Sequence, residues 1–109
     1  IPKTYRVTVL GEPTDKVLNT LRNGVVLDDG YKTIPCDVSI RSTDDERSVL
    51  EITIYEGKNR QIRRMCEAVG LEVTLLKRER IGKISIGNMP VGEFRKLEDS
   101  EIEYLQSLQ

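Results

Sequence analysis

Alternating apolar and polar residues predict most of the strands in this chain of 109 residues. Four segments have this character: Tyr5–Leu10, Asp37–Ile40, Val49–Tyr55 and Val73–Ile81. In the third of them Leu50, Ile52 and Ile54 fall on one face, as expected for a strand with one side against a core. We expect the polar, acidic stretch Ser42–Ser48 to be the loop between the second and third strands.

Apolar residues at helical spacing predict two helices between these strands. The first is capped by Thr14 or Asp15 and is closed by Asn23-Gly24. The second opens at Gly57-Lys58-Asn59 and ends at Gly70. Its apolar residues share one face of the helix and most of its charged residues share the other, as in any amphipathic surface helix.

The order strand-helix-strand-strand-helix-strand is typical of an α+β domain with a ferredoxin-like (split βαβ) plait. We therefore expect a single domain over residues 1–109, with a mostly antiparallel sheet and two packed helices. A short C-terminal helix is predicted from Asp99 or Ser100, because Ser100 and Glu103 have the spacing of a capping box. In a simple plait, we expect the start of the first strand and the start of the second helix at opposite ends of the sheet.

Composition excludes several classes of protein and of active site. The chain is 38% hydrophobic and 32% charged, and it has no apolar run long enough for a membrane-spanning helix. It contains no His, which excludes a Ser-His-Asp triad, a Cys-His pair and any metal site that uses His. Its two cysteines, Cys36 and Cys66, are far apart in the sequence, and we interpret them as reduced core residues of a cytoplasmic protein.

Charge is distributed unevenly along the chain, although the formal net charge is only −1. Residues 57–83 carry eight basic and three acidic side chains, whereas the segments before and after them are each net acidic. A basic segment between acidic ones is a candidate surface for a polyanion such as nucleic acid. A solvated, charged helix would explain the same charges without any function.

Four cations crowd the start of the second predicted helix: Lys58, Arg60, Arg63 and Arg64. The first turn of a helix favours acidic residues, so these cations oppose local stability. Backbone N–H groups after a glycine, together with cations that are mostly arginine, suit phosphate or carboxylate groups. In the basic run that follows, alternation is expected to put Arg78 and Arg80 on the same face of the strand Val73–Ile81.

Two other features have simpler explanations. The acidic groups Asp28-Asp29 and Asp44-Asp45-Glu46 could suggest a metal site, but turn chemistry explains them better, and we predict no metal. Tyr5 begins a strand, and its spacing alone favours a half-buried core residue over a site residue.

Six short motifs occur in order and at ordinary spacing: Lys3-Thr4-Tyr5, residues 21–30 (LRNGVVLDDG), Pro35 with Val38, residues 56–65 (EGKNRQIRRM), residues 76–82 (LKRERIG) and residues 86–97 (IGNMPVGEFRKL). Each motif alone is weak. Together they resemble the C-terminal part of the catalytic domain of bacterial ribosomal RNA pseudouridine synthases of the RsuA/RluB type.

This resemblance implies a reaction and two catalytic residues. Such enzymes break the glycosidic bond of specific uridines in ribosomal RNA, turn the base and rejoin it through carbon 5, with no cofactor. Tyr5 matches the active-site Tyr of the family, which stacks on the target base. Arg63 matches the Arg that pairs with the catalytic Asp and keeps that carboxylate ionised. RNA contacts are expected at Lys58, Asn59, Arg60, Arg64, Arg78 and Arg80.

The catalytic Asp of the family lies in a Gly-Arg-Leu-Asp motif upstream of the Tyr motif, and this chain contains no such motif. We therefore expect a fragment that begins just after the missing motif and is inactive by itself. The small N-terminal RNA-binding domain of many members is not in the chain either. Two other interpretations stay open: a non-catalytic RNA-binding module, and a plait-type regulatory domain whose arginines bind an anionic metabolite.

Overall fold

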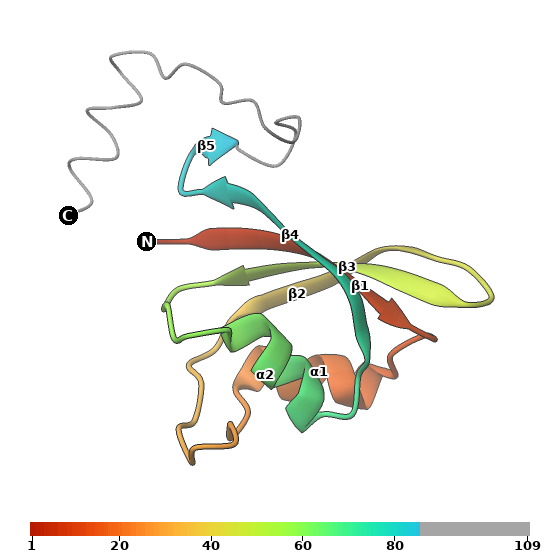
Figure 1. Ribbon diagram of the computed structural model, residues 1–109, viewed down its shortest axis with the longest axis horizontal. Coiled ribbons are helices and arrows are strands. Elements are labelled where there is room, and N and C mark those ends of the chain that lie inside the picture. The colour runs from red at the N-terminus through yellow and green to blue at the C-terminus, as the bar shows by residue number, and fades with distance from the viewer. Residues whose placement is uncertain (86–109) are drawn as a thin grey trace.

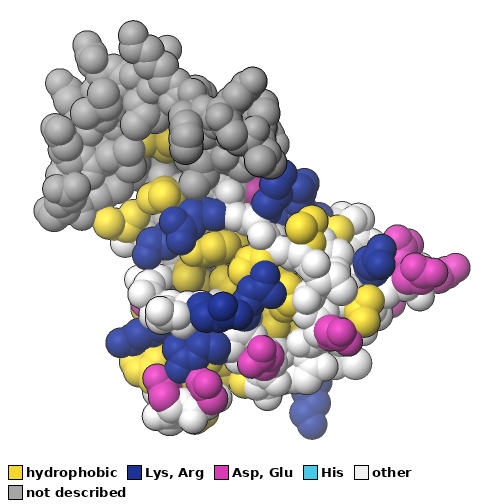
Figure 2. Space-filling model, in the orientation of Figure 1, with side chains coloured by type: hydrophobic (Ala, Val, Ile, Leu, Met, Phe, Trp, Pro, Cys, Tyr) yellow, Lys and Arg dark blue, Asp and Glu magenta, His cyan; other side chains and the backbone are white. Residues whose placement is uncertain are grey.

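The computed structural model describes residues 1–85, which are coloured in Figures 1 and 2. Its elements, in chain order, are β1 (Lys3–Leu10), α1 (Asp15–Asn23), β2 (Asp37–Thr43), β3 (Arg47–Ile54), α2 (Gln61–Ala68), β4 (Val73–Ile81) and β5 (Ile84–Ser85). The strands form one sheet in the order β2-β3-β1-β4-β5, and all neighbours are antiparallel. Both helices lie on the same side of the sheet (Figure 1).

The α+β class, the antiparallel sheet and the two helices are thus as predicted. The predicted short C-terminal helix lies outside the described residues. Within residues 1–85, no helix is long and apolar enough to cross a membrane.

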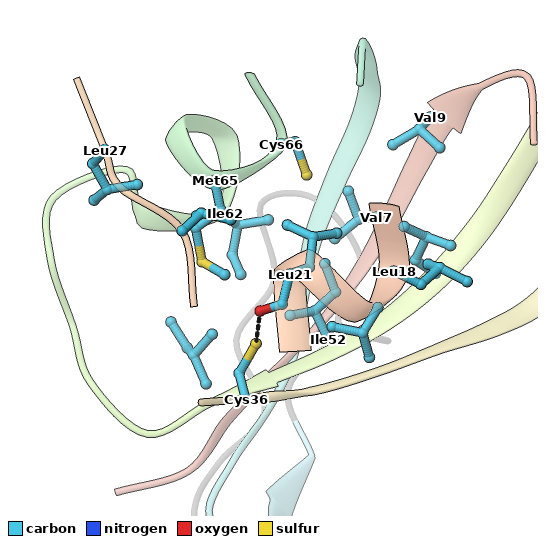
Figure 3. Packing of buried hydrophobic residues seen from close by; sticks show 14 residues of the cluster. Val7, Val9, Leu18, Leu21, Leu27, Cys36, Ile52, Ile62, Met65 and Cys66 are labelled. Atoms are coloured by element: carbon cyan, nitrogen blue, oxygen red, sulfur yellow. Dashed lines mark hydrogen bonds between the residues drawn. The ribbon is translucent and has the colours of Figure 1, made fainter. Parts of the chain in front are cut away.

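The core lies between the sheet and the helices, and strand alternation decides which side chains enter it (Figure 3). Val7 and Val9 of β1 are fully buried. Leu50, Ile52 and Ile54 of β3 are buried on the same side, as their spacing predicted. Burying a side chain of this size contributes about 1.5–3 kcal/mol, so these two central strands supply much of the driving force for folding.

Both cysteines are free thiols in this core, as predicted. The Cys36 thiol donates a hydrogen bond to the backbone carbonyl of Leu21 at 3.2 Å (Figure 3). Burial raises the pKa of Cys36 to about 11 and that of Cys66 to about 12. Neither side chain is therefore a thiolate nucleophile at neutral pH, and both act as small packing residues.

Helix α1 uses one of the two caps that the sequence offered. The Thr14 hydroxyl oxygen accepts a hydrogen bond from the backbone N–H of Val17 at 3.2 Å. Such a cap satisfies one of the N–H groups that have no partner inside the helix. Leu18 and Leu21 then pack into the core on the face turned toward the sheet.

The hairpin between β2 and β3 is longer than predicted. The stretch Ser42–Ser48, expected to be a loop, is mostly strand: pairing continues until Thr43 faces Ser48. The Asp44 carboxylate accepts hydrogen bonds from the backbone N–H groups of Glu46 and Arg47, both at 2.8 Å, and so closes a tight turn. The prediction was wrong because it relied on the alternation of apolar residues. Backbone hydrogen bonds between strands form equally well through polar residues, which show no such alternation.

Helix α2 is shorter than predicted, because it begins at Gln61 rather than at Gly57. Its end is as predicted. Gly70, at φ 78°, donates its N–H to the carbonyl of Glu67, and the N–H of Leu71 reaches the carbonyl of Cys66. These two bonds form a Schellman motif. The motif favours glycine at position 70, because the backbone of that residue is left-handed. A helix this short is marginal by itself, so its buried face must hold it in place.

The start of β1 and the start of α2 lie at the same end of the sheet. Lys3 at the start of β1 pairs with Ile54 at the end of β3, and a short connection then leads to α2. The expectation that these two points lie at opposite ends was wrong. Because β3 runs antiparallel to β1, it ends where β1 begins. The next helix, α2, therefore starts at the same end of the sheet.

An irregularity in β4 separates two arginines that were expected on one face. Tyr5 pairs with Arg78, but the register then shifts and leaves Glu79 as an extra residue before Arg80. Arg78 contacts Tyr5, whereas Arg80 contacts Glu51, whose neighbours in β3 point into the core. Arg80 therefore lies on the opposite face of the sheet. The prediction was wrong because side chains alternate only where pairing is regular.

Gly24, which ends α1, should be the least replaceable glycine among the described residues. Its φ of 110° is strained for any other residue, and an added Cβ would lie 2.3 Å from the backbone carbonyl oxygen of Thr33. We expect Gly24→Ala to lower the free energy of unfolding by at least about 2 kcal/mol in urea titrations. Gly30→Ala is the matched control, because φ is 88° but no atom lies within 4 Å of the added Cβ. It should cost only about 1 kcal/mol; equal losses would contradict the steric argument.

Candidate nucleic-acid interface

A cleft of about 390 Å³ opens where the starts of β1 and α2 meet β4. The connection between β3 and α2 forms one wall, and β1 and β4 form the other. Its lining residues are Lys3, Tyr5, Ile54, Gly57, Lys58, Asn59, Arg60, Gln61, Ile62, Leu76 and Arg78. The cleft thus brings together the Tyr motif at the start of the chain and most of the basic motif that follows β3.

Charge in this cleft has one sign. Its lining includes four cationic residues and no acidic ones: Lys3, Lys58, Arg60 and Arg78. Figure 2 shows Lys and Arg side chains gathered on the face that carries α2, with hydrophobic surface between them. A concave surface lined by one sign of charge concentrates ligands of opposite charge, and phosphate groups are the obvious candidates.

The remaining lining is apolar and aromatic. Ile54 and Ile62 are buried beneath it, and Leu76 is partly buried. Tyr5 is half-buried and packs against the core with one part of its ring while another part lines the cleft. The expected half-buried position of Tyr5 is thus observed, and its ring is also accessible from the cleft. An aromatic ring beside cations is the usual platform for an unstacked nucleic-acid base.

Arg78 holds Tyr5 from the neighbouring strand. Its Nε donates a hydrogen bond to the Tyr5 hydroxyl oxygen at 3.2 Å, and the guanidinium carbon lies 5.4 Å from the ring centroid. The second distance is within the range of a cation–π contact.

The loop before α2 has a strained backbone that side chains hold in place. Arg60 has a φ of 51°, which makes it the one non-glycine residue with positive φ among the described residues. Gln61 is buried, and its Oε1 accepts a hydrogen bond from the backbone N–H of Lys58 at 3.1 Å. Left-handed backbone in a residue with a side chain costs of the order of 1–2 kcal/mol, so it persists only where neighbours fix it.

Glu56 anchors this loop to the rest of the molecule. Its carboxylate accepts hydrogen bonds from the Tyr31 hydroxyl, the backbone N–H of Ile34 at 2.9 Å and the Gln61 amide at 2.9 Å. Burial alone would raise the pKa of Glu56, but these hydrogen bonds outweigh it and hold the pKa below its usual range. The side chain is therefore ionised at neutral pH.

Arg64 and Lys58 have partners inside the chain. Arg64 donates to Asp28 and to the backbone carbonyl of Asn59, and it forms a 2.8 Å ion pair with Asp29. Hydrogen bonds to the two carboxylates raise the pKa of Arg64. The Lys58 ammonium lies 4.4 Å from the centroid of the Tyr31 ring and also lines the cleft. Arg64 thus braces the loop rather than lining the cleft.

Arg63 lies outside the Tyr5 cleft. It lines a separate pocket of about 350 Å³, together with Glu67, Glu72 and residues at the end of α2. The structure therefore does not bring the two expected catalytic residues, Tyr5 and Arg63, into one cavity. Arg80, also expected to contact RNA, lies 3.3 Å from Glu51 on the other face of the sheet.

Three further residues, which the sequence did not predict as part of a site, shape the cleft. Lys3 lines the cleft from the start of β1, and Glu56 and Gln61 hold the loop opposite. A signal for Gln61 existed, because it stands four residues before Met65 and so lies near the apolar face of the helix. Glu56 stands at the start of the motif of residues 56–65, but the sequence did not indicate what its side chain contacts.

The chain is similar in sequence and in structure to known proteins. It is 39% identical over 110 residues to the ribosomal large subunit pseudouridine synthase B of Bacillus subtilis, covering 99% of this chain and 45% of that protein. It is 42% identical over 100 residues to the dual-specificity RNA pseudouridine synthase RluF of Salmonella typhi, covering 92% of this chain and 33% of that protein. This chain is homologous to RNA pseudouridine synthases.

A solved pseudouridylate synthase has the same fold, with a TM-score of 0.78 and 32% sequence identity over 95% of this chain and 44% of that chain. No family model matches the chain. The resemblance drawn from the sequence motifs is thereby confirmed. The chain spans less than half the length of each of these proteins.

The lowered pKa of Glu56 should make stability depend on pH. A carboxylate whose pKa is lower in the folded state stabilises it above the ordinary carboxyl pKa, and this stability is lost as the pH falls through the lowered value. Urea unfolding between pH 7 and pH 3 should therefore show a smaller loss of unfolding free energy for Glu56→Gln than for the wild type. Tyr31→Phe removes one of the three hydrogen bonds and should give an intermediate loss. If the unfolding free energy of all three proteins fell equally with pH, Glu56 would not be the source of the pH dependence.

Proposed function

We propose that this chain is the C-terminal part of the catalytic domain of an RNA pseudouridine synthase that isomerises specific uridines in ribosomal RNA. The observation that carries the proposal is the cleft in which Tyr5 lies among four cationic residues and no acidic ones. Homology to RNA pseudouridine synthases over nearly the whole chain supports it. A ribosomal RNA substrate implies a cytoplasmic protein.

Tyr5 and the cations of the cleft have distinct roles in this proposal. Tyr5 stacks on the extruded uracil base and takes part in proton transfer at its carbon 5. Lys58, Asn59 and Arg60 bind the phosphates on either side, with Arg78 on the opposite wall. The two remaining expected RNA contacts, Arg64 and Arg80, have carboxylate partners and contribute less.

Arg63 is proposed to pair with the catalytic Asp of the family. Because that Asp belongs to a Gly-Arg-Leu-Asp motif that these 109 residues do not contain, we expect the chain alone to convert no uridine. The reaction needs no cofactor in this proposal. Arg63 would favour the ionised form of a carboxylate supplied to its pocket, as a nucleophile requires, and would have to outweigh the opposing charges of Glu67 and Glu72 in the same lining.

We also propose that the fold is a ferredoxin-like plait. The order β2-β3-β1-β4, with antiparallel neighbours and two helices between the strands in sequence, supports this assignment. In this arrangement residues 1–109 act as one domain. The site then forms at the end of the sheet where the first strand begins and the second helix follows the third strand.

Tyr5→Phe in the full-length protein tests the enzyme against a non-catalytic RNA-binding module. Phe keeps the stacking surface but cannot handle a proton, so RNA affinity should persist while single-turnover conversion of uridine falls roughly 10²–10⁴-fold. Tyr5→Ala should also weaken RNA binding, by about 1–3 kcal/mol for the lost stacking. If Tyr5→Phe converted uridine at the wild-type rate, the role of Tyr5 would be purely structural. RNA binding without any conversion, even by the wild type, would favour the binding module.

Arg63→Lys in the full-length protein tests the proposed pairing with a carboxylate. Lys keeps the charge but lacks the planar fork that binds a carboxylate through two hydrogen bonds. Conversion should therefore be nearly abolished in Arg63→Lys as well as in Arg63→Ala. Thermal and urea unfolding should change by no more than about 0.5 kcal/mol, because the side chain lies on the polar face of α2. A variant Arg63→Lys with most of the wild-type activity would contradict the pairing.

A further inference from the structure

Arg78 differs from the other arginines of strands β2 and β4 in what it contacts. Arg41 forms ion pairs with Glu51 and Glu79, and Arg80 forms one with Glu51. No ion pair joins Arg78 to a carboxylate anywhere in residues 1–85; its contact is the hydroxyl of Tyr5. Arg78 thus contacts a phenol hydroxyl, although acidic side chains that pair with the other two arginines lie on the opposite face of the sheet.

The sheet itself fixes this contact. Arg78 and Tyr5 are direct neighbours in the register of β4 and β1, and the irregularity at Glu79 follows immediately. In a regularly paired strand Arg80, two residues after Arg78, would lie on the same face as Arg78. The irregularity instead puts Arg80 on the opposite face, so Arg78 is the one arginine of β4 that lies beside the ring of Tyr5.

The chemistry of the two groups then determines how the hydroxyl is presented. A guanidinium group has only donors, so the Tyr5 oxygen must accept the hydrogen bond from Arg78 Nε. The proton of the Tyr5 hydroxyl is consequently directed away from Arg78. The guanidinium also lies against the ring, which restricts rotation of the half-buried side chain.

We propose that Arg78 is a positioning residue for Tyr5, which holds the phenol ring and its hydroxyl proton in one orientation toward a uracil base bound in the cleft. This inference rests on the proposed function, and it changes the role of Arg78 from a phosphate contact to one that acts through Tyr5. A phosphate contact predicts an effect on RNA affinity. A positioning residue predicts an effect on the rate of conversion that depends on the Tyr5 hydroxyl.

A double-mutant cycle in the full-length protein separates these roles. Arg78→Met keeps the length of the side chain but removes the donor and the charge. We expect it to slow single-turnover conversion at saturating RNA by roughly 10-fold or more. In a Tyr5→Phe background the same change should alter the remaining rate by less than about 2-fold. An equal fall in both backgrounds would overturn the inference.

RNA affinity measured at several salt concentrations gives a second readout. Loss of a phosphate contact lowers the slope of log K against log salt by about one, whereas loss of a positioning residue leaves it unchanged. Lys58→Met is the control for a cleft cation that contacts phosphate. It should reduce both the RNA affinity and the salt slope, and by the same amounts in the wild-type and the Tyr5→Phe backgrounds. Arg47→Met, an exposed arginine at the end of the sheet away from the cleft, should change neither rate nor affinity. A slope reduced by Arg78→Met as much as by Lys58→Met would overturn the inference.

Arg78→Lys keeps a cation and a donor and should retain more of the rate than Arg78→Met, with the fold of each variant verified by thermal melting. A final measurement does not depend on activity. In protein labelled with ¹³C at tyrosine Cζ, with Tyr5 assigned from Tyr5→Phe, the Tyr5 resonance should shift in Arg78→Met and not in Arg80→Met. An unchanged resonance would overturn the inference by itself. A shifted resonance in a protein that converts no uridine would support the contact and reject the proposed function instead.

Discussion

The carboxylate of Glu56 joins three parts of the chain that meet at the site. It follows directly after β3, and it accepts hydrogen bonds from the segment between α1 and β2 and from the first residue of α2. Through Gln61 the network continues to the backbone N–H of Lys58, inside the loop that lines the cleft. This carboxylate therefore helps to fix the loop and its strained backbone at Arg60 against the sheet, together with Arg64, which donates to the carbonyl of Asn59.

Acidic residues decide which of the many basic side chains can act on a ligand. Asp28 and Asp29 bind Arg64, and Glu51 and Glu79 bind arginines on the open face of the sheet. The cations of the cleft have no acidic residue in the same lining. A net charge of −1 is therefore compatible with a strongly positive cavity, because neutralisation is local.

The irregularity in β4 and the antiparallel register build the cleft together. The register brings Tyr5 to the end of the sheet where α2 begins. The irregularity at Glu79 leaves Arg78 as the one arginine of β4 on the face that carries Tyr5. Arg63, in the first turn of α2, faces a different pocket. Tyr5 and Arg63, the two residues that the family resemblance marks as catalytic, thus line different cavities.

The sequence by itself determined the features that depend on neighbours along the chain. Periodicity identified the buried faces of β3 and α2 and the bounds of β4, residue type limited the cap of α1 to Thr14 or Asp15, and the motifs identified the family. Only the tertiary structure decided which cations remain available. Arg64 and Arg80 bind carboxylates that are 36 and 29 residues away in the sequence, those of Asp28 and Glu51. A local sequence pattern cannot indicate such contacts. The same reason explains the errors at the hairpin and at Arg80: strand pairing and register are set by backbone hydrogen bonds between distant segments, whereas periodicity reports only which way a regular segment faces.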